Sequence, residues 1–269
     1  MEMGTFKEEN GAPVLPEAAV EEPEIKDAVE FARKLLKFEP DERQAAVLQS
    51  EAKRGILNCT RQWGKSTVAA TKALYRAYTR PNSLVLVASP SERQSGEFMR
   101  KAAEMVALLG IRPRGDGDNK ISLLLPNKSR IVGLPGVEGT GRGFSKVSML
   151  LIDEASRVDD EIFKMLRPTI AVGGGDMWLM STPYGKRGFF YSIWEHGGPG
   201  WERVCVPATE CPRIEKAYLE EERTHHGVLG FAQEYLCSFV DNGANVFGRD
   251  VVERAFDDSV AALKIGPKK

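Results

Sequence analysis

Cysteine is scarce in this sequence of 269 residues, and its few copies form no recognisable pair. The four cysteines (Cys59, Cys205, Cys211 and Cys237) include no CxxC spacing, which excludes a disulfide-stapled scaffold and favours a reducing, cytosolic setting. No apolar run approaches the roughly 18 residues that a membrane-spanning helix needs, and no signal-peptide pattern is present at the N-terminus. The composition is that of an ordinary globular protein, and we expect no membrane partner.

Net charge is also nearly absent, because the sequence contains 37 basic and 38 acidic side chains. The acids are unevenly spread, since residues 1–30 hold nine acidic side chains, two lysines and three prolines. Such a segment buries too little apolar surface to offset its ordering entropy, so we predict a disordered acidic arm over residues 1–30. The rest of the chain then has about six more basic than acidic side chains, which permits a nucleic-acid surface and is equally compatible with scattered solvated cations.

The most informative stretch is GILNCTRQWGKSTVAAT, residues 55–71. A short apolar run predicts a buried strand, residues 60–64 a tight loop, and Lys65 onward a helix. In that order, Gly64 lets the backbone approach a polyphosphate, Lys65 places a charge on the β and γ phosphates, and the Ser66 hydroxyl ligates Mg²⁺. Cys59 stands where the pattern GxxxxGK[S/T] has its first glycine, so the loop must turn without one there. The alternative is a GKS tripeptide at an ordinary helix start.

A helix opened by Pro40 and capped by Asp41 is predicted just upstream of this loop. Gln44 lies one turn into it. Because an amide donates and accepts at once, it suits the N6 and N7 edge of adenine, and we predict adenine recognition there over a solvent-facing glutamine.

Further apolar runs predict an α/β core over residues 31–208. We expect a strand at 83–89, an amphipathic helix at 91–109, and a hairpin of residues 121–126 and 130–135 inserted before the next parallel strand. A helix at 187–194 and a strand at 201–207 follow. Residues 209–269 are predicted to form a C-terminal helical lid or linker, with helices at 214–223 and 231–239.

Two later strands end in polar residues that suit nucleotide chemistry. MLLIDE, residues 149–154, carries Asp153 and Glu154 to the carboxyl edge of the sheet, where Asp153 would hold Mg²⁺ and Glu154 would take a proton from the attacking water. DMWLMSTP, residues 176–183, ends in Ser181 and Thr182, whose hydroxyls can reach toward the γ-phosphate and Glu154. Together with the phosphate loop, these strand ends favour ATP hydrolysis over binding alone.

In combination, these motifs resemble one family. RQWGKST, LLIDEAS and STPYG, with the upstream glutamine, the run Thr140 to Gly143 and the later FAQEYLCSFVDNGANVF, resemble the ATPase domain of the large terminase subunit of tailed double-stranded DNA phages. The resemblance covers about residues 38–247. It implies a P-loop NTPase of the ASCE, RecA-like type, with a mainly parallel sheet flanked by helices.

The resemblance also implies roles for individual residues. The nucleotide-binding loop comprises Thr60, Arg61, Gln62, Trp63, Gly64, Lys65, Ser66 and Thr67. Asp153 matches the metal position, Glu154 the catalytic carboxylate, and the run Ser181, Thr182, Pro183 the coupling motif. Arg142 matches a basic residue that related packaging motors use as a finger reaching into a neighbour's site, and Arg61 is its rival.

The cofactors so implied are ATP and Mg²⁺. The implied partners are double-stranded DNA, a homo-oligomeric ring on the phage portal, the portal protein and the small terminase subunit. The implied location is the host cytoplasm, docked on the procapsid portal during packaging. Large terminases usually continue into a nuclease, but too little sequence follows Asp250 for one, so we expect no nuclease activity. About 85 residues after Thr182 also leave no room for the second RecA-like domain of a helicase. A helicase-like or DNA-repair ATPase and a non-hydrolysing nucleotide-binding regulatory module remain as alternatives.

Overall fold

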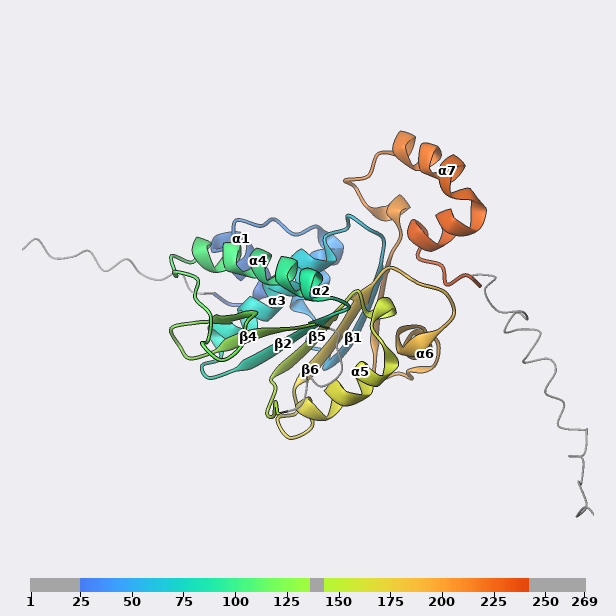
Figure 1. Ribbon diagram of the computed structural model, residues 1–269. Helices are drawn as coiled ribbons and strands as arrows, with labels where there is room; N and C mark the ends of the chain where they lie inside the picture. The colour runs from blue at the N-terminus through green and yellow to red at the C-terminus, as the bar shows by residue number, and fades with distance from the viewer. Residues whose placement is uncertain (1–24, 136–142, 242–269) are drawn as a thin grey trace, which may run out of the picture.

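A seven-stranded sheet forms the centre of the molecule, in the order β3-β4-β2-β5-β6-β1-β7 (Figure 1). The computed structural model describes residues 25–135 and 143–241. All neighbouring strands pair in parallel except β3 with β4. The strands are β1 Arg54–Cys59, β2 Leu84–Ser89, β3 Ser122–Leu124, β4 Arg130–Pro135, β5 Met149–Asp153, β6 Asp176–Ser181 and β7 Glu202–Val206.

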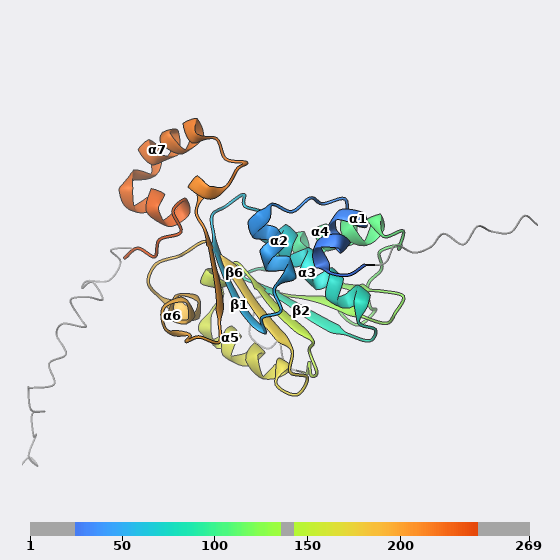
Figure 2. The same cartoon turned by 180° about the vertical axis from the view of Figure 1, so that it is seen from behind.

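Helices cover both faces of this sheet, so the fold is a three-layer α/β domain (Figures 1 and 2). One face carries α1 Ala28–Lys34, α2 Glu42–Gln49, α3 Lys65–Thr79 and α4 Glu92–Leu108. The other carries α5 Asp160–Leu166 and α6 Gly188–His196, with the short 3₁₀ helices η1 Ala155–Arg157 and η2 Arg167–Ile170. The predicted α/β core with a mainly parallel sheet is confirmed.

The last described helix stands apart from the three layers (Figure 1). Beyond β7 come the 3₁₀ helix η3 Ala208–Glu210 and then α7 Lys216–Glu234, which is kinked at Gly227 (φ 64°, ψ 174°). A small apolar cluster of Ala208, Leu219 and Phe231 holds this appendage together.

Local sequence explains where the elements of the core begin and end. The central strands β2 and β5 are buried along their whole length, as expected for apolar runs covered on both faces. Asp41 and Gln44 form a reciprocal capping box at the start of α2, and the Ser91 hydroxyl caps α4. Gly55 lets β1 approach β6 closely, because a Cβ there would lie 2.3 Å from the Trp178 ring.

The predicted hairpin of β3 and β4 is confirmed, but β4 also pairs in parallel with β2, so the hairpin is part of the main sheet and not an insertion. Two other details of the sequence prediction are wrong. The predicted helix at 231–239 ends at Glu234, and Cys237 (φ 57°) turns the backbone out of helical geometry. The predicted arm also ran too far, because Asp27 caps α1 and the next two residues, Ala28 and Val29, are buried. Residues 1–24 of that arm lie outside the described residues.

Candidate nucleotide site

The predicted site residues converge at the carboxyl edge of three neighbouring strands. β1 runs into the loop 60–64, β5 ends at Asp153 and β6 ends at Ser181. Because these strands are parallel and adjacent in the order β5-β6-β1, their ends lie side by side. α3 begins at Lys65, directly after the loop, so its N-terminal amides point into the same region.

The loop turns without a glycine at its start. Cys59 is still part of β1, its side chain is buried in the core, and the pKa of its thiol is raised to about 12 by burial. The left-handed residues are instead Gln62 (φ 66°) and Gly64 (φ 97°). The strand thus extends through the position where the general pattern has its first glycine, and the sharp turn comes later.

Lys65 connects the loop to the end of β6. Its Nζ atom donates to the carbonyl oxygens of Cys59 (3.0 Å) and Thr60 (2.9 Å) and to Thr182 Oγ1 (3.2 Å). Thr182 Oγ1 donates in turn to the Cys59 carbonyl oxygen (3.1 Å). All three acceptors of the ammonium are neutral, so these bonds leave its positive charge for an anion.

Asp153 and Ser66 provide oxygen ligands of the kind that Mg²⁺ prefers. Ser66 Oγ donates to Asp153 Oδ2 at 3.3 Å, and the backbone N–H of Glu154 donates to Asp153 Oδ1 at 3.1 Å. Burial, and next the charge of Glu154, raise the pKa of Asp153 to about 6. A divalent cation would stabilise the ionised form, so these residues fit the metal. Across residues 25–135 and 143–241 no group of three His, Cys, Asp or Glu side chains could hold a metal ion.

Glu154 lies in an unusual backbone conformation at the rim of the site. Its φ of 49° is left-handed, which costs a residue with a side chain of this size of order 1–3 kcal/mol. Its Oε2 atom accepts a hydrogen bond from Ser181 Oγ at 3.4 Å. Ser156, two residues on, bonds to Ser181 Oγ (2.7 Å) and donates to the Thr182 carbonyl oxygen (2.8 Å). The end of β5 is therefore bonded to the end of β6, where the sequence predicts a coupling motif.

Gln44 holds the phosphate loop in this structure. Its Nε2 donates to the Trp63 carbonyl oxygen (2.7 Å), its Oε1 accepts from the Asp41 backbone N–H (3.0 Å), and it is 1% exposed. Arg213 reaches the same Trp63 oxygen (2.6 Å) and pairs with Asp41 (3.1 Å). Sequence reasoning missed Arg213, because nothing in a local pattern signals a partner 150 residues away. Adenine recognition by Gln44 stays a prediction.

The end of α7 is attached to both halves of the site. Arg61 Nε pairs with Glu234 Oε2 at 2.9 Å, and Thr60 Oγ1 donates to the Glu234 carbonyl oxygen at 3.1 Å. The adjacent Gln233 accepts, through Oε1, the backbone N–H of Gly185 at 3.0 Å, just after the coupling motif. The exposed Arg61 therefore lies at the rim, held by the C-terminal appendage. Arg142, the other candidate finger, lies outside the described residues.

The phosphate loop, the start of α3 and Glu154 line a cavity of about 620 Å³ with a strong excess of positive charge. Glu154 is the acid among its lining residues, and the cations are Arg61, Lys65, Arg93, Lys101 and Arg157. Lys101, on α4, donates to Thr67 Oγ1 (3.1 Å). Such a lining suits a ligand with several negative charges, as a nucleoside triphosphate has.

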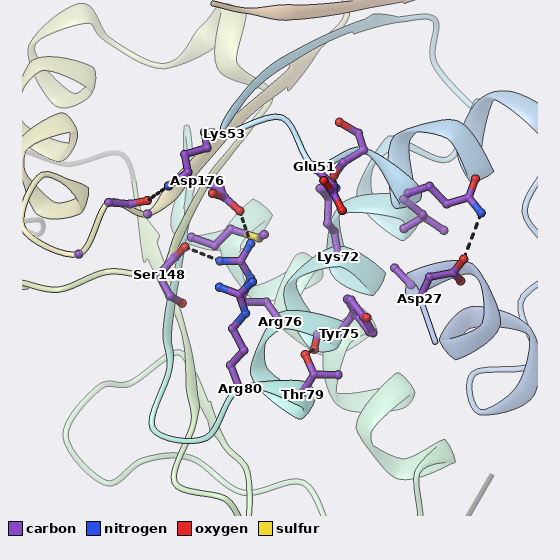
Figure 3. Close-up of a pocket in the computed structure, with 18 of the residues that line it drawn as sticks. Asp27, Glu51, Lys53, Lys72, Tyr75, Arg76, Thr79, Arg80, Ser148 and Asp176 are labelled. Atoms are coloured by element: carbon purple, nitrogen blue, oxygen red, sulfur yellow. Dashed lines mark hydrogen bonds and ion pairs between the residues drawn. The ribbon is translucent and has the colours of Figure 1, made fainter. Parts of the chain in front are cut away.

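A second cavity, of about 570 Å³, lies at the opposite edge of the sheet and has a different character (Figure 3). Arg76 pairs with Asp176 and donates to the Ser148 carbonyl oxygen. Lys72 donates to the carbonyl oxygens of Val47 (2.9 Å) and Ser50 (3.0 Å) and lies 4.4 Å from the Trp178 ring centroid. Burial lowers the pKa of Lys72 to about 8. Both cations are engaged within the protein and join α2 and α3 to the sheet, so we assign them a structural role.

Comparison with known proteins gives one consistent family. Residues 56–254 match the family model described as terminase large subunit, T4likevirus-type, N-terminal. The large terminase subunit of Thermus virus P23-45 is 25% identical over 248 residues, which cover 79% of this chain and 51% of that protein. The chain thus spans about half the length of the curated relatives it matches.

Solved structures support the same fold. The large terminase ATPase domain of Thermus phage P74-26 has a TM-score of 0.70 and 21% identity, and the match covers 80% of this chain and all of that one. The large terminase of a thermophilic bacteriophage in complex with ATP-gamma-S has a TM-score of 0.61 and 14% identity, covering 74% of this chain and 52% of that one. At these identities the likeness is one of fold.

Proposed function

Because the chain belongs to the T4likevirus-type terminase large-subunit family, N-terminal part, we propose that it hydrolyses ATP with Mg²⁺ and that hydrolysis drives double-stranded DNA into a phage capsid. The observation that carries the proposal is the meeting of Lys65, Ser66, Asp153 and Glu154 at one sheet edge, beside a cavity whose charged lining residues are five cations and one acid. The fold alone would be compatible with other nucleotide-dependent functions.

In the proposed reaction, a water oxygen attacks the γ-phosphorus and ADP leaves. The N-terminal amides of α3 and the Lys65 ammonium bind the phosphates, and Glu154 accepts the proton of the attacking water. Ser66 and Asp153 would hold Mg²⁺, which would neutralise negative charge on the phosphate when bound. Ser181 keeps Glu154 oriented through their 3.4 Å contact.

The coupling segment Ser181, Thr182 and Pro183 would carry the nucleotide state to α7. Thr182 shares a contact with Lys65, and Gly185, two residues past Pro183, is bonded to Gln233 at the end of α7. A shift of Lys65 toward a phosphate therefore changes the bonds of the segment that holds the appendage. This arrangement supports a mechanical output, as a packaging motor requires.

The partners follow from the family. We propose a homo-oligomeric ring docked on the portal of a procapsid in the host cytoplasm, working with the portal protein and the small terminase subunit. Contacts with DNA would be mainly to phosphates and hence sensitive to salt and indifferent to base sequence, because a motor must pass over every sequence. No helix within the described parts of the chain is both long and apolar enough to cross a membrane.

Steady-state phosphate release with Mg-ATP tests the enzymatic part of the proposal. We expect turnover in the parent chain and none in Lys65→Ala or Glu154→Ala, with ATP still bound by Glu154→Ala. The exposed Arg80, which lines the cavity at the opposite edge, gives the matched control Arg80→Gln, which should keep parental turnover. ATP binding without turnover at any protein concentration would instead favour a nucleotide-binding regulatory module.

A further inference from the structure

Arg157 is a cation of the nucleotide cavity that the proposed reaction has not used. It ends η1, three residues after Glu154, and lines the same cavity as Lys65 and Ser66. Its guanidinium carbon lies 4.0 Å from the centroid of the Tyr184 ring. Among the described residues its guanidinium makes no hydrogen bond or ion pair, so its five N–H donors are free for a ligand.

The other cations of this cavity differ from Arg157 in what holds them. Lys65 donates to two carbonyls and a hydroxyl, Arg61 pairs with Glu234, and Lys101 donates to Thr67. Arg93 is exposed, and in the described part of the chain nothing orients its side chain. Arg157 alone in this set combines unused donors with an aromatic ring beneath its guanidinium, which limits the positions this exposed side chain adopts.

A guanidinium fixed in this way suits a phosphate. Its N–H groups lie in one plane and can bind two phosphate oxygens at once, while its face stays on the aromatic ring. Stacking also reduces the conformational freedom that binding would otherwise remove. The neighbouring Glu154 is the group that acts at the γ-phosphate in the proposed reaction, so Arg157 lies near the end of the triphosphate.

We propose that Arg157 binds the terminal phosphate of ATP, that this contact lets the protein distinguish ATP from ADP, and that Tyr184 is the positioning residue. The inference rests on the proposed function and adds a specificity determinant to it. Tyr184 stands between Pro183 of the coupling segment and Gly185, which is bonded to Gln233. The group that recognises the terminal phosphate therefore packs on the segment to which α7 is attached.

Calorimetric affinities for ATP-gamma-S and for ADP, both with Mg²⁺, test the assignment. Arg157→Gln should weaken ATP-gamma-S binding by about tenfold to a hundredfold, as expected for a lost charged hydrogen bond, and leave ADP binding within about twofold. Tyr184→Leu should weaken ATP-gamma-S selectively but less. The double variant should bind ATP-gamma-S almost as tightly as Arg157→Gln alone, because both substitutions remove the same contact between Arg157 and Tyr184.

The matched control is Arg187→Gln. Arg187 also lies over the Tyr184 ring, at 4.8 Å, but lines a different cavity. The ratio of the ATP-gamma-S affinity to the ADP affinity should therefore be the same in Arg187→Gln as in the parent chain. Equal weakening of both nucleotides in Arg157→Gln, or no weakening of either, would overturn the inference and leave the proposed function standing. A parent chain that binds neither nucleotide would overturn both.

Discussion

Asp153 is a buried carboxyl whose protonation depends on what binds beside it. Its pKa of about 6 lies above its ordinary value of 3.8, so the folded chain holds this proton more tightly than the unfolded chain. The protonated Asp153 carboxyl therefore contributes fully to the stability of the fold below about pH 4. This contribution is lost as the pH rises through 6. At neutral pH without metal, the ionised group is a cost to folding, which Mg²⁺ would offset.

Asp153→Asn should accordingly make the metal-free protein more stable at pH 7 to 8. About two pKa units correspond to about 2–3 kcal/mol in the free energy of unfolding, and the difference should shrink toward zero near pH 4. Denaturant unfolding in a chelating buffer at several pH values measures it. A difference between variant and parent that is constant across this range would refute the buried-carboxyl explanation. Mg-ATP should stabilise the parent and not the variant.

Single residues also mark the limit of what the sequence could predict. Lys65, Ser66, Asp153 and Glu154 could be predicted as one group because phosphate chemistry dictates their local spacing, and they lie together in the structure. The contacts of Arg157 with Tyr184 and of Arg213 with Trp63 could not be found, because they depend on which loops the sheet order brings together.

Among the elements, the strands were predicted better than α1 and the end of α7. The strands β1, β2, β5 and β6 were predicted to within two residues, since apolar runs between turn residues leave few alternatives. α1 was not predicted at all, because the acidic composition before it masked the Asp27 cap and the buried Val29. The end of α7 was misplaced, because Cys237 adopts a conformation that its residue type does not announce.

The attachment of α7 leads to a prediction about Gln233. Its Oε1 receives the buried N–H of Gly185, so Gln233→Leu leaves that donor unsatisfied and should cost about 1–3 kcal/mol of stability. We further expect ATP-gamma-S to alter amide hydrogen exchange in residues 216–234 of the parent, and to alter it far less in the variant. Gln49→Leu is the control, because Gln49 bonds to Asp27 at the opposite edge of the sheet. An unchanged response in Gln233→Leu would mean that the nucleotide signal travels elsewhere.

For the whole molecule, the main question is whether one copy completes the site of another. The cavity contains Arg61 and Arg157 from its own chain, whereas Arg142 is the candidate finger for a neighbour. Finger arginines contribute about 10³ to 10⁵ in rate where tested, so the source of this group should dominate the kinetics.

If Arg142 acts in a neighbouring copy, ATPase activity should rise steeply with protein concentration. Arg142→Ala should abolish ATPase activity. Mixing Arg142→Ala with Glu154→Ala protein should restore part of it, since the first variant keeps the catalytic Glu154 and the second keeps the Arg142 finger. Phosphate release over a range of protein concentrations measures this. Activity that is linear in enzyme concentration, with Arg142→Ala fully active, would leave Arg61 as the finger.

The two attachments of α7 also constrain how it can move. Glu234 is bonded to the phosphate loop and Gln233 to the segment after Pro183, so adjacent residues of α7 contact the loops that follow two different strands, β1 and β6. Asn58 and Ala208 also bond to the chain just beyond the helix, at Cys237 and Tyr235, so the root of α7 is held at several points. A relative shift of the two loops would therefore tilt α7 about this root. The Gly227 bend, where Val228 and Leu229 lie exposed, would then be displaced more than the root itself.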